Sequence, residues 1–407
     1  MRILFVHNNF PGQFKHLAPA LAERGHDVLG LTPETNPNAI TLPAAKYKWS
    51  EQRYSQKDFG LAAAYAKMTR RGEVVAAAAL ELRDRHGYHP DAVFGTPGWG
   101  ETLFLREIWP KARHLLYGEF YYGPHDPILG FDPEFAAPTT ADRISRTAAS
   151  AHLVMASVSA DQILTPMQWQ ARSHPGFLRD RISVIHDGID TALLTPGGDA
   201  SVQVPGSALT FRRGDEIITF INRNLEPARG FHIFMRALPA VLAQRPNAHA
   251  VIIGGDGQSY SAPPATGQTW KQTMLEEVGN RLDLSRVHFT GTIPYRTFIA
   301  LMRVTRVHAY LTYPFVLSWS MLEAMSAGAH VIGSRTPPVE EVIEDGVNGQ
   351  LVDFFDVAEW SSALIAALNA PETFSRVREN ARTTIVERYD LRSICLPRLI
   401  EFVEKAG

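Results

Sequence analysis

The sequence predicts an α/β protein made of two doubly wound parallel-sheet domains, and three observations support this fold class. The chain has 407 residues, which exceeds the roughly 250–300 residues at which a single core stops growing. Short apolar runs alternate with helical segments in both halves, as in the βαβ units of a parallel sheet. Residues 195–201, between the halves, have loop composition.

We place the domain boundary near residues 190–213. We therefore expect an N-terminal domain over residues 1–190, a C-terminal domain over residues 191–390, and a last helix, residues 391–407, that packs back on the first domain.

The first half opens with a complete βαβ unit. Residues 3–6 are expected to form a buried strand, residues 14–24 a helix and residues 27–31 the next strand. Gly12, in the connecting loop, lets the backbone approach a ligand closely, or it is an ordinary turn glycine.

Two further strands of the first half end in loops rich in candidate ligand-binding residues. Residues 91–94 lead into Trp99 and Glu101, and residues 115–117 lead into a Gly- and Pro-rich loop. Ligands of open α/β sheets lie beyond the carboxyl ends of strands, so we expect binding residues here. The candidates are Trp99, Glu101, Glu119, Tyr121 and His125. Both glutamates could equally be ordinary caps or surface groups. The apolar runs at residues 152–156 and 182–185 complete the first half as strands.

Residues 46–71 are strongly basic. They contain seven Lys or Arg against two acidic residues, namely Lys46, Lys48, Arg53, Lys57, Lys67, Arg70 and Arg71 against Glu51 and Asp58. Aromatic residues are interleaved. The stretch could bind an anionic acceptor or make weak peripheral contact with an anionic membrane. The alternative is a solvated helix face with aromatic anchors into the core.

The second half repeats the alternation of strands and helices. Strands are expected at residues 216–221, 250–253, 287–289, 307–311, 330–333 and 349–352. Helices are expected at residues 231–244, 269–281 and 321–327, the last ended by Gly328.

The second half also carries residues suited to a phosphate. Arg223 and Arg229 flank one strand-to-helix loop, and guanidinium groups bind phosphate through paired hydrogen bonds. The loop before residue 321 offers a helix N-terminus, which favours an anion. Ser320 and Glu323 have capping-box spacing, so Glu323 could serve only that helix end. The sequence shows no Asp-x-Asp pair at a strand end and no His/Cys cluster with zinc spacing, so we expect no metal and no resident cofactor.

Composition excludes other classes of protein. The formal net charge of -2 gives no general attraction to nucleic acid. The single cysteine, Cys395, excludes an internal disulfide framework and suits a reducing compartment. There is no signal-peptide core and no apolar run of about 20 residues that would span a membrane. We expect a cytoplasmic protein, and the sequence indicates no oligomeric state.

An ordered set of motifs resembles glycosyltransferase family four, the retaining enzymes of the GT-B fold. The set comprises the loop ending at Gly12, GHDV at residues 25–28, VIHDGID at 184–190, Arg223 with Arg229-Gly230, GGDG at 254–257, LEAMSAG at 322–328 and EEVIEDGVNG at 340–349. The segments at residues 98–101, 119–122 and 131–134 resemble a subgroup of that family.

The resemblance implies a metal-independent, retaining transfer of a sugar from a UDP- or GDP-sugar to a hydroxyl acceptor. Arg223 and Arg229 would bind the diphosphate, Glu323 the ribose and Ile293 the base. The whole donor set is Gly12, Asn222, Arg223, Arg229, Gly255, Ile293, Phe315, Val316, Leu317, Ser318, Trp319, Ser320 and Glu323. Trp99, Glu101, Tyr121 and His125 would lie on the acceptor side, and the product would belong to glycan, glycolipid or natural-product biosynthesis.

Two positions depart from the family pattern. Phe315 stands where the family has a glutamate near the donor sugar, and Glu119 replaces the usual histidine, so we expect Glu119 to act with Arg223 and Arg229. A sugar-nucleotide epimerase or a phosphorylase of the same fold is an alternative function. Phe315 also suggests a second alternative, namely a degenerate relative of the family that binds nucleotide or glycan without turnover. A dehydrogenase is disfavoured, because no full dinucleotide fingerprint follows a strand.

Overall fold

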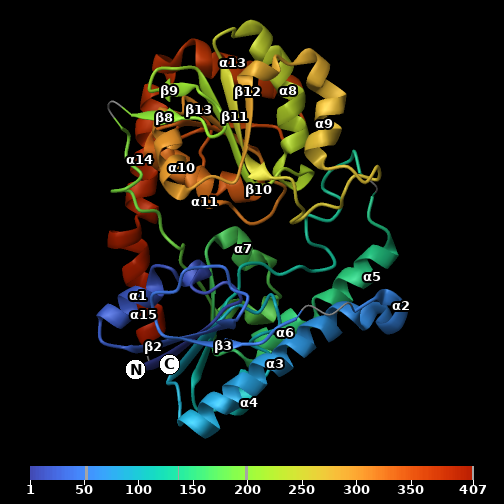
Figure 1. The fold of residues 1–407 in the computed structure, drawn as a ribbon, viewed down its shortest axis with the longest axis vertical. Helices are drawn as coiled ribbons and strands as arrows, with labels where there is room; N and C mark the ends of the chain where they lie inside the picture. The colour runs from blue at the N-terminus through green and yellow to red at the C-terminus, as the bar shows by residue number, and fades with distance from the viewer. Residues whose placement is uncertain (51–53, 136, 198–199, 406–407) are drawn as a thin grey trace. The chain divides into compact units, whose positions relative to one another are not determined.

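The computed structural model describes residues 1–50, 54–135, 137–197 and 200–405. It divides the chain into two compact units, Met1–Asp187 with Cys395–Gly407, and Gly188–Ile394 (Figure 1). Glu51 and Arg53 of the basic stretch, two residues of the loop at 195–201 and the last two residues of the expected C-terminal helix lie outside the described residues.

The first unit contains a seven-stranded parallel sheet in the order β3-β2-β1-β4-β5-β6-β7. Its strands are β1 (Arg2–Val6), β2 (Asp27–Pro33), β3 (Ala44–Tyr47), β4 (Ala92–Gly95), β5 (Arg113–Tyr117), β6 (Gln162–Thr165) and β7 (Ile182–Val184). The strand order reverses between β1 and β4. This reversal is the mark of a doubly wound sheet, as predicted.

The helices of the first unit cover both faces of this sheet. They are η1 (Gly12–Phe14), α1 (Leu17–Glu23), α2 (Gln56–Phe59), η2 (Gly60–Ala62), α3 (Ala63–His86), α4 (Leu105–Ile108), α5 (Thr140–Ala149), α6 (Ala151–Ser159), α7 (Gln168–Ser173), η3 (Gly176–Arg181) and α15 (Leu396–Glu404). Alternate residues of β1 point to opposite faces. Ile3 and Phe5 pack with α1 and α15, whereas Leu4 and Val6 pack with α3 and α4.

One predicted strand of the first unit is wrong. Residues 152–156 lie in the helix α6, and the strand is β6, ten residues further on. A short apolar run does not distinguish a buried helix from a buried strand, because periodicity needs more residues to show. Here His152, Leu153 and Ala156 form the buried stripe of a helix.

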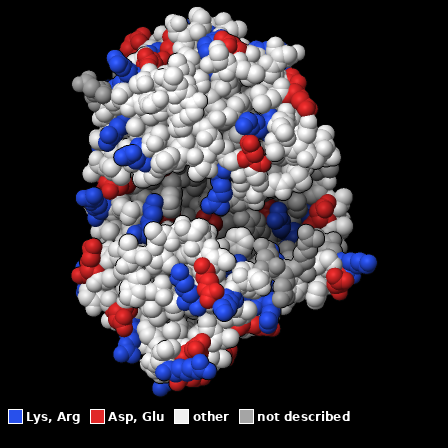
Figure 2. Space-filling view, in the orientation of Figure 1, with Lys and Arg blue, Asp and Glu red and all other residues white. Residues whose placement is uncertain are grey.

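The basic stretch at residues 46–71 spans β3, α2, η2 and the start of α3. Its charges are partly used within the unit, since Arg70 pairs with Glu73 at 2.8 Å and Arg71 is buried. Figure 2 shows acidic and basic side chains interspersed on the face it presents. Contact with a membrane surface stays a prediction. Among the described helices, not one combines the length and apolar character that crossing a bilayer requires.

The last helix joins the first unit through a charged contact as well as through the core. Arg24 donates to both carboxylate oxygens of Glu404, from Nε at 2.8 Å and from Nη2 at 3.0 Å. His26 Nε2 lies 2.8 Å from Oε1 of the same carboxylate. These hydrogen bonds lower the pKa of Glu404 from 4.5 to about 2, and the largest contribution comes from Arg24.

Acidification is therefore expected to destabilise the first unit through Glu404. Its folded pKa is depressed, so the stabilisation is complete above about pH 4.5 and is lost as the pH falls towards 2. The side chain is 27% exposed, so the effect should stay below about 1 kcal/mol. Denaturant unfolding at pH 7 and pH 3.5 measures it in the wild type and in Glu404→Gln. An identical pH dependence in both proteins would contradict the assignment.

The second unit contains a six-stranded parallel sheet in the order β12-β11-β10-β13-β14-β15. Its strands are β10 (Ile217–Asn224), β11 (His249–Gly255), β12 (Val287–Gly291), β13 (Val307–Tyr310), β14 (His330–Ser334) and β15 (Gln350–Val352), beside the antiparallel pair β8 (Ser201–Gln203) and β9 (Thr210–Arg212). The order reverses between β10 and β13, so the second sheet is doubly wound like the first.

The helices of the second unit follow the predicted alternation. They are η4 (Pro227–Arg229), α8 (Phe231–Gln244), α9 (Trp270–Val278), η5 (Gly279–Arg281), η6 (Leu284–Arg286), α10 (Tyr295–Val304), α11 (Trp319–Ala327), α12 (Pro337–Glu340), α13 (Val357–Asn369), η7 (Pro371–Phe374) and α14 (Ser375–Tyr389), followed by the π-helical turn η8 (Leu391–Cys395) that leads into α15. The expected helix at residues 231–244 is confirmed, and the left-handed cap at Gly328 is confirmed by its φ of 83°.

Candidate functional site

In the second unit, the candidate residues gather where the strand order reverses. The chain leaves β10 and enters α8 through η4, and it leaves the neighbouring β13 and enters α11 through a loop. Gly230 makes the close approach of these two connections possible. It has a φ of +69°, and a Cβ atom on it would lie 2.2 Å from Cβ of Leu311. A crevice at this switch point is the usual ligand position in such sheets.

Arg229 is a buried charged residue at this switch point. Its side chain is buried, and Nη1 donates to Thr312 Oγ1 and to the carbonyl oxygen of Val316, both at 2.8 Å. Its guanidinium carbon lies 5.2 Å from the ring centres of both Tyr260 and Phe315. Among the described residues, no carboxylate lies within ion-pair distance of this guanidinium. A buried cation with only neutral neighbours can neutralise an anionic ligand.

Arg223 lies near the end of β10, together with the predicted donor residue Asn222. The Arg223 side chain is exposed, and it makes no hydrogen bond or ion pair with another described residue. The backbone of Gly255 pairs with this strand end, because Leu225 donates its N–H to the Gly255 carbonyl at 2.9 Å. Arg223 and Arg229 thus flank one connection but differ in burial, and only Arg229 is held by hydrogen bonds.

Glu226 is a functional candidate that sequence reasoning missed. This buried carboxylate accepts hydrogen bonds through Oε2 from the backbone N–H groups of Ser259, Tyr260 and Ser261, at 3.2, 3.0 and 3.0 Å. Ser261 Oγ also accepts from the N–H of Ala228 at 2.9 Å. The loop after β11 is thereby fixed against the turn that carries Arg229. No local pattern in the sequence indicates this role, because the partners lie 33 to 35 residues further along.

Glu323 does not cap its own helix, so the capping-box interpretation is wrong. The helix α11 begins at Trp319, and Ser318 is the cap, its Oγ accepting from the N–H of Ser320 at 3.4 Å. Glu323 is buried, and Oε1 accepts a hydrogen bond from Tyr295 at 2.8 Å. Burial and the nearby Glu323 carboxylate raise the pKa of Tyr295. Tyr295 starts α10, two residues after the half-buried Ile293.

The predicted loop at residues 315–320 contributes mainly backbone groups and buried apolar side chains. Phe315 and Leu317 are buried. The Val316 carbonyl holds Arg229, and the Ser318 N–H donates to the Tyr310 hydroxyl at 2.7 Å. Buried side chains and backbone hydrogen bonds together thus fix the shape of this loop.

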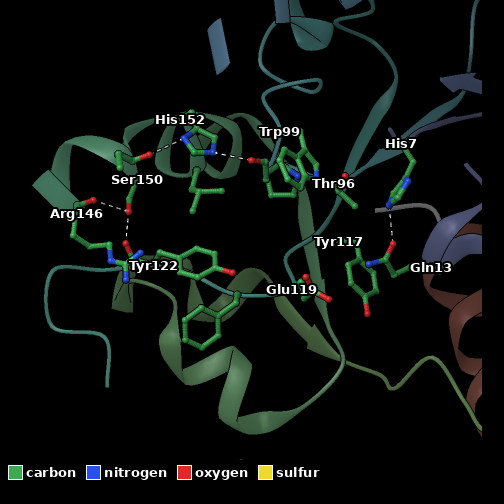
Figure 3. Close-up of a pocket in the computed structure, with 15 residues that line it drawn as sticks. His7, Gln13, Thr96, Trp99, Tyr117, Glu119, Tyr122, Arg146, Ser150 and His152 are labelled. Carbon is green, nitrogen blue, oxygen red and sulfur yellow. Dashed lines mark hydrogen bonds between the residues drawn. The ribbon is translucent and has the colours of Figure 1, made fainter. Parts of the chain in front are cut away.

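The first unit has its own hollow at the equivalent reversal of strand order, with a volume of about 300 Å³ (Figure 3). It lies beyond the carboxyl ends of β1, β4 and β5. It is lined by His7, Gln13, Thr96, Pro97, Gly98, Trp99, Tyr117, Glu119, Phe120, Tyr122, Arg146, Ala149, Ser150, His152 and Leu153. Two predicted residues, Trp99 and Glu119, are therefore brought together here. Tyr121 and His125 instead line a second hollow of about 270 Å³.

His7 and Gln13 form a fixed polar pair in this hollow. His7 Nδ1 accepts from the N–H of Asn9 at 2.9 Å, so Nε2 carries the proton and donates to Gln13 Oε1 at 2.7 Å. Burial lowers the pKa of His7 to about 4, so the imidazole is neutral at neutral pH. Gly12 makes room for this ring, since a Cβ atom there would lie 2.5 Å from it. Contact of Gly12 with a donor stays a prediction.

Glu101 lies beneath the wall of the hollow and has no exposed surface. Its carboxylate accepts from the Tyr47 hydroxyl and lies 3.4 Å from Arg71 Nε. Burial raises the pKa of Glu101. Arg71 in turn lies 5.0 Å from the ring centre of Trp49 and 5.9 Å from that of Trp99. Glu101 is thus linked to the lining residue Trp99 through Arg71, and its acceptor-side role stays a prediction.

Two doubly wound units of this kind define the GT-B class of α/β fold, which confirms the predicted fold class. HepE of Anabaena, solved in complex with UDP and glucose, aligns over 99% of both chains with 18% identity and a TM-score of 0.67. Sucrose-phosphate synthase of Thermosynechococcus elongatus aligns over 98% of this chain and 97% of its own, with 18% identity and a TM-score of 0.67.

Two family models match consecutive parts of the sequence. The model of the glycosyl transferase family 4 group matches residues 24–194, and that of glycosyl transferases group 1 matches residues 207–384. Residues 207–384 thus match the group 1 glycosyltransferases, in agreement with the resemblance seen in the motifs.

Curated relatives match over a shorter stretch. D-inositol 3-phosphate glycosyltransferase of Corynebacterium efficiens is 28% identical over 204 residues, which are 50% of this chain and 46% of the relative. The enzyme of the same description from Corynebacterium glutamicum is 29% identical over 204 residues, 50% of this chain and 47% of its own. The chain spans about half the length of the curated relatives it matches.

Proposed function

We propose that this protein transfers a sugar from a nucleoside diphosphate sugar to a hydroxyl acceptor, with retention at the anomeric carbon and without a divalent ion. The observation that carries the proposal is the buried Arg229 guanidinium, which has no carboxylate partner among the described residues. A diphosphate would supply the missing negative charge, and the match of residues 207–384 to the group 1 glycosyltransferases favours a sugar nucleotide as the source of that diphosphate.

The donor would be held mainly by the second unit. Arg229, with the exposed Arg223 beside it, would contact the diphosphate, and Glu323 would accept hydrogen bonds from the ribose hydroxyls. Ile293 would contact the base through its backbone. UDP is the first nucleotide to test, because HepE was solved with UDP and glucose, and GDP is the second.

The acceptor would bind in the hollow of the first unit. Trp99 is 46% exposed and offers an apolar ring face to a sugar or polyol, while Gln13 and Glu119 offer polar groups for its hydroxyls. Such an acceptor would fit glycan, glycolipid or natural-product biosynthesis in the cytoplasm.

The reaction would proceed on one face of the donor sugar. The acceptor hydroxyl attacks the anomeric carbon on the side from which the diphosphate leaves, and a phosphate oxygen takes the hydroxyl proton. Arg223 and Arg229 would stabilise the charge that develops on the leaving phosphate. One well-placed donor to a developing oxyanion contributes roughly 10²–10³ in rate, so two guanidinium groups could take the role of a metal.

Binding without turnover is a second candidate function, favoured by Phe315. An apolar ring there offers the donor sugar no hydrogen bond. Slow donor hydrolysis or detectable transfer would exclude this alternative.

The proposed function is tested by incubating the protein with UDP- and GDP-sugars and following release of nucleoside diphosphate. We expect release with one nucleotide series, at the same rate in EDTA and in manganese. Proton NMR of the product should show the anomeric configuration of the donor. Release that depends strictly on added Mg²⁺ or Mn²⁺, or a product of inverted configuration, would contradict the proposal.

A further inference from the structure

The surroundings of Arg229 are uncommon for a buried cation. Such a group is normally paired with a carboxylate, because an unpaired charge is costly to desolvate. Here the hydrogen-bond acceptors are a hydroxyl and a carbonyl oxygen, and two aromatic rings lie at 5.2 Å from the guanidinium carbon. Ring faces attract a cation through their quadrupole without cancelling its charge.

The two rings come from different loops and contact each other. Phe315 follows β13 and is 2% exposed, whereas Tyr260 lies in the loop after β11 and is 39% exposed. Their ring centres are 4.6 Å apart at an interplanar angle of 59°. Together they restrict the guanidinium from two directions and leave its charge available.

Glu226 explains why Tyr260 stays in this position. Three successive backbone N–H groups around Tyr260 donate to one oxygen of this carboxylate. The same contacts engage the Glu226 charge, so the carboxylate three residues before Arg229 in the sequence forms no ion pair with it. Glu226 thereby fixes the loop and leaves Arg229 unneutralised.

We infer that Tyr260 and Phe315 form an aromatic clamp that holds the Arg229 guanidinium, without a counter-ion, for the phosphates of the ligand, and that Glu226 positions the clamp. The inference rests on the proposed function for the identity of the ligand, a nucleoside diphosphate. It makes Tyr260, Phe315 and Glu226 positioning residues. It also gives Phe315 a role, because its ring attracts the guanidinium without neutralising the charge.

The clamp is tested by titrating inorganic pyrophosphate, UDP and GDP into the full-length protein by isothermal calorimetry. Phe315→Leu and Phe315→Tyr form a matched pair, since the first removes the ring and the second keeps it. We expect Phe315→Leu to weaken pyrophosphate binding about tenfold and Phe315→Tyr to keep most of the affinity. Tyr260→Ala should weaken it about tenfold, and Tyr260→Phe should restore most of that loss, because the ring is kept. Glu226→Gln should weaken it several-fold, and thermal melting checks that each variant is folded.

The outcomes separate the clamp from the proposed function. Equal affinities of Phe315→Leu and Phe315→Tyr, or wild-type affinity of Tyr260→Ala, would overturn the clamp. If pyrophosphate binds with the expected pattern but neither UDP nor GDP binds, the clamp stands and the sugar-nucleotide donor is refuted. If the wild type binds none of the three, both fail.

Discussion

Replacing Arg229 by alanine is expected to lower sugar transfer, or slow donor hydrolysis, about 10³-fold. The guanidinium is buried and held by two hydrogen bonds, so it acts on a developing phosphate charge with little screening by water. Its removal also leaves Thr312 Oγ1 and the Val316 carbonyl without a donor. Arg223→Ala should cost less, about 10²-fold at most, because its side chain is exposed and moves more freely.

Single-turnover assays with a UDP-sugar, or a GDP-sugar if that series is active, measure the effect of each substitution. Arg376→Ala is the control, because Arg376 is an exposed arginine on α14 of the same unit. Its rate should match the wild type. Near-normal turnover in both Arg223→Ala and Arg229→Ala would count decisively against the proposed role of the two guanidinium groups.

Gly230→Ala is expected to destabilise the second unit by more than about 4 kcal/mol, an exceptional loss for one substitution. The residue has a φ of +69°, which costs an L-residue about 1–2 kcal/mol by itself. The added Cβ atom would also lie 2.2 Å from Cβ of Leu311. Cβ atoms do not approach so closely, so β13 and the start of α8 would have to separate.

Gly346→Ala separates these two contributions. Gly346 also has a positive φ, of +74°, but a Cβ atom on it would meet nothing within 4 Å. We expect this variant to lose only the conformational part, about 1–2 kcal/mol. Denaturant unfolding followed by tryptophan fluorescence compares the two variants. Equal stability losses would show that the contact with Leu311 relaxes easily.

The fold was predictable because most of its strands are apolar runs bounded by glycine or proline. The strand at residues 307–311 and the helix at residues 231–244 are read directly from such patterns, and the structure confirms both. The run at residues 152–156 misled because a histidine followed by four apolar residues suits either a strand or a buried helix stripe. The edge strand β3 carries a lysine and two alanines, so its sequence gives little indication of a strand.

The candidate site was predictable where chemistry alone identifies a residue. Arginines beside a strand-to-helix loop indicate a phosphate wherever they occur, so Arg229 could be named from the sequence. Glu226 and Tyr260 could not, because their roles depend on a loop that returns to β10 only in the folded chain. The spacing of Ser320 and Glu323 suggested a cap, but the preceding Ser318 begins the helix.

The contribution of α15 to the first unit sets the order in which the two units can be completed during synthesis. Leu399, Phe402 and Val403 belong to the same core cluster as Ile3, Phe5 and Phe94. The second unit ends at Ile394, so its whole sequence is synthesised before that of this helix, and the first unit keeps an apolar sheet face uncovered until the helix follows. A chain truncated before residue 396 would therefore hold the full sequence of the second unit beside a first unit whose core is unfinished.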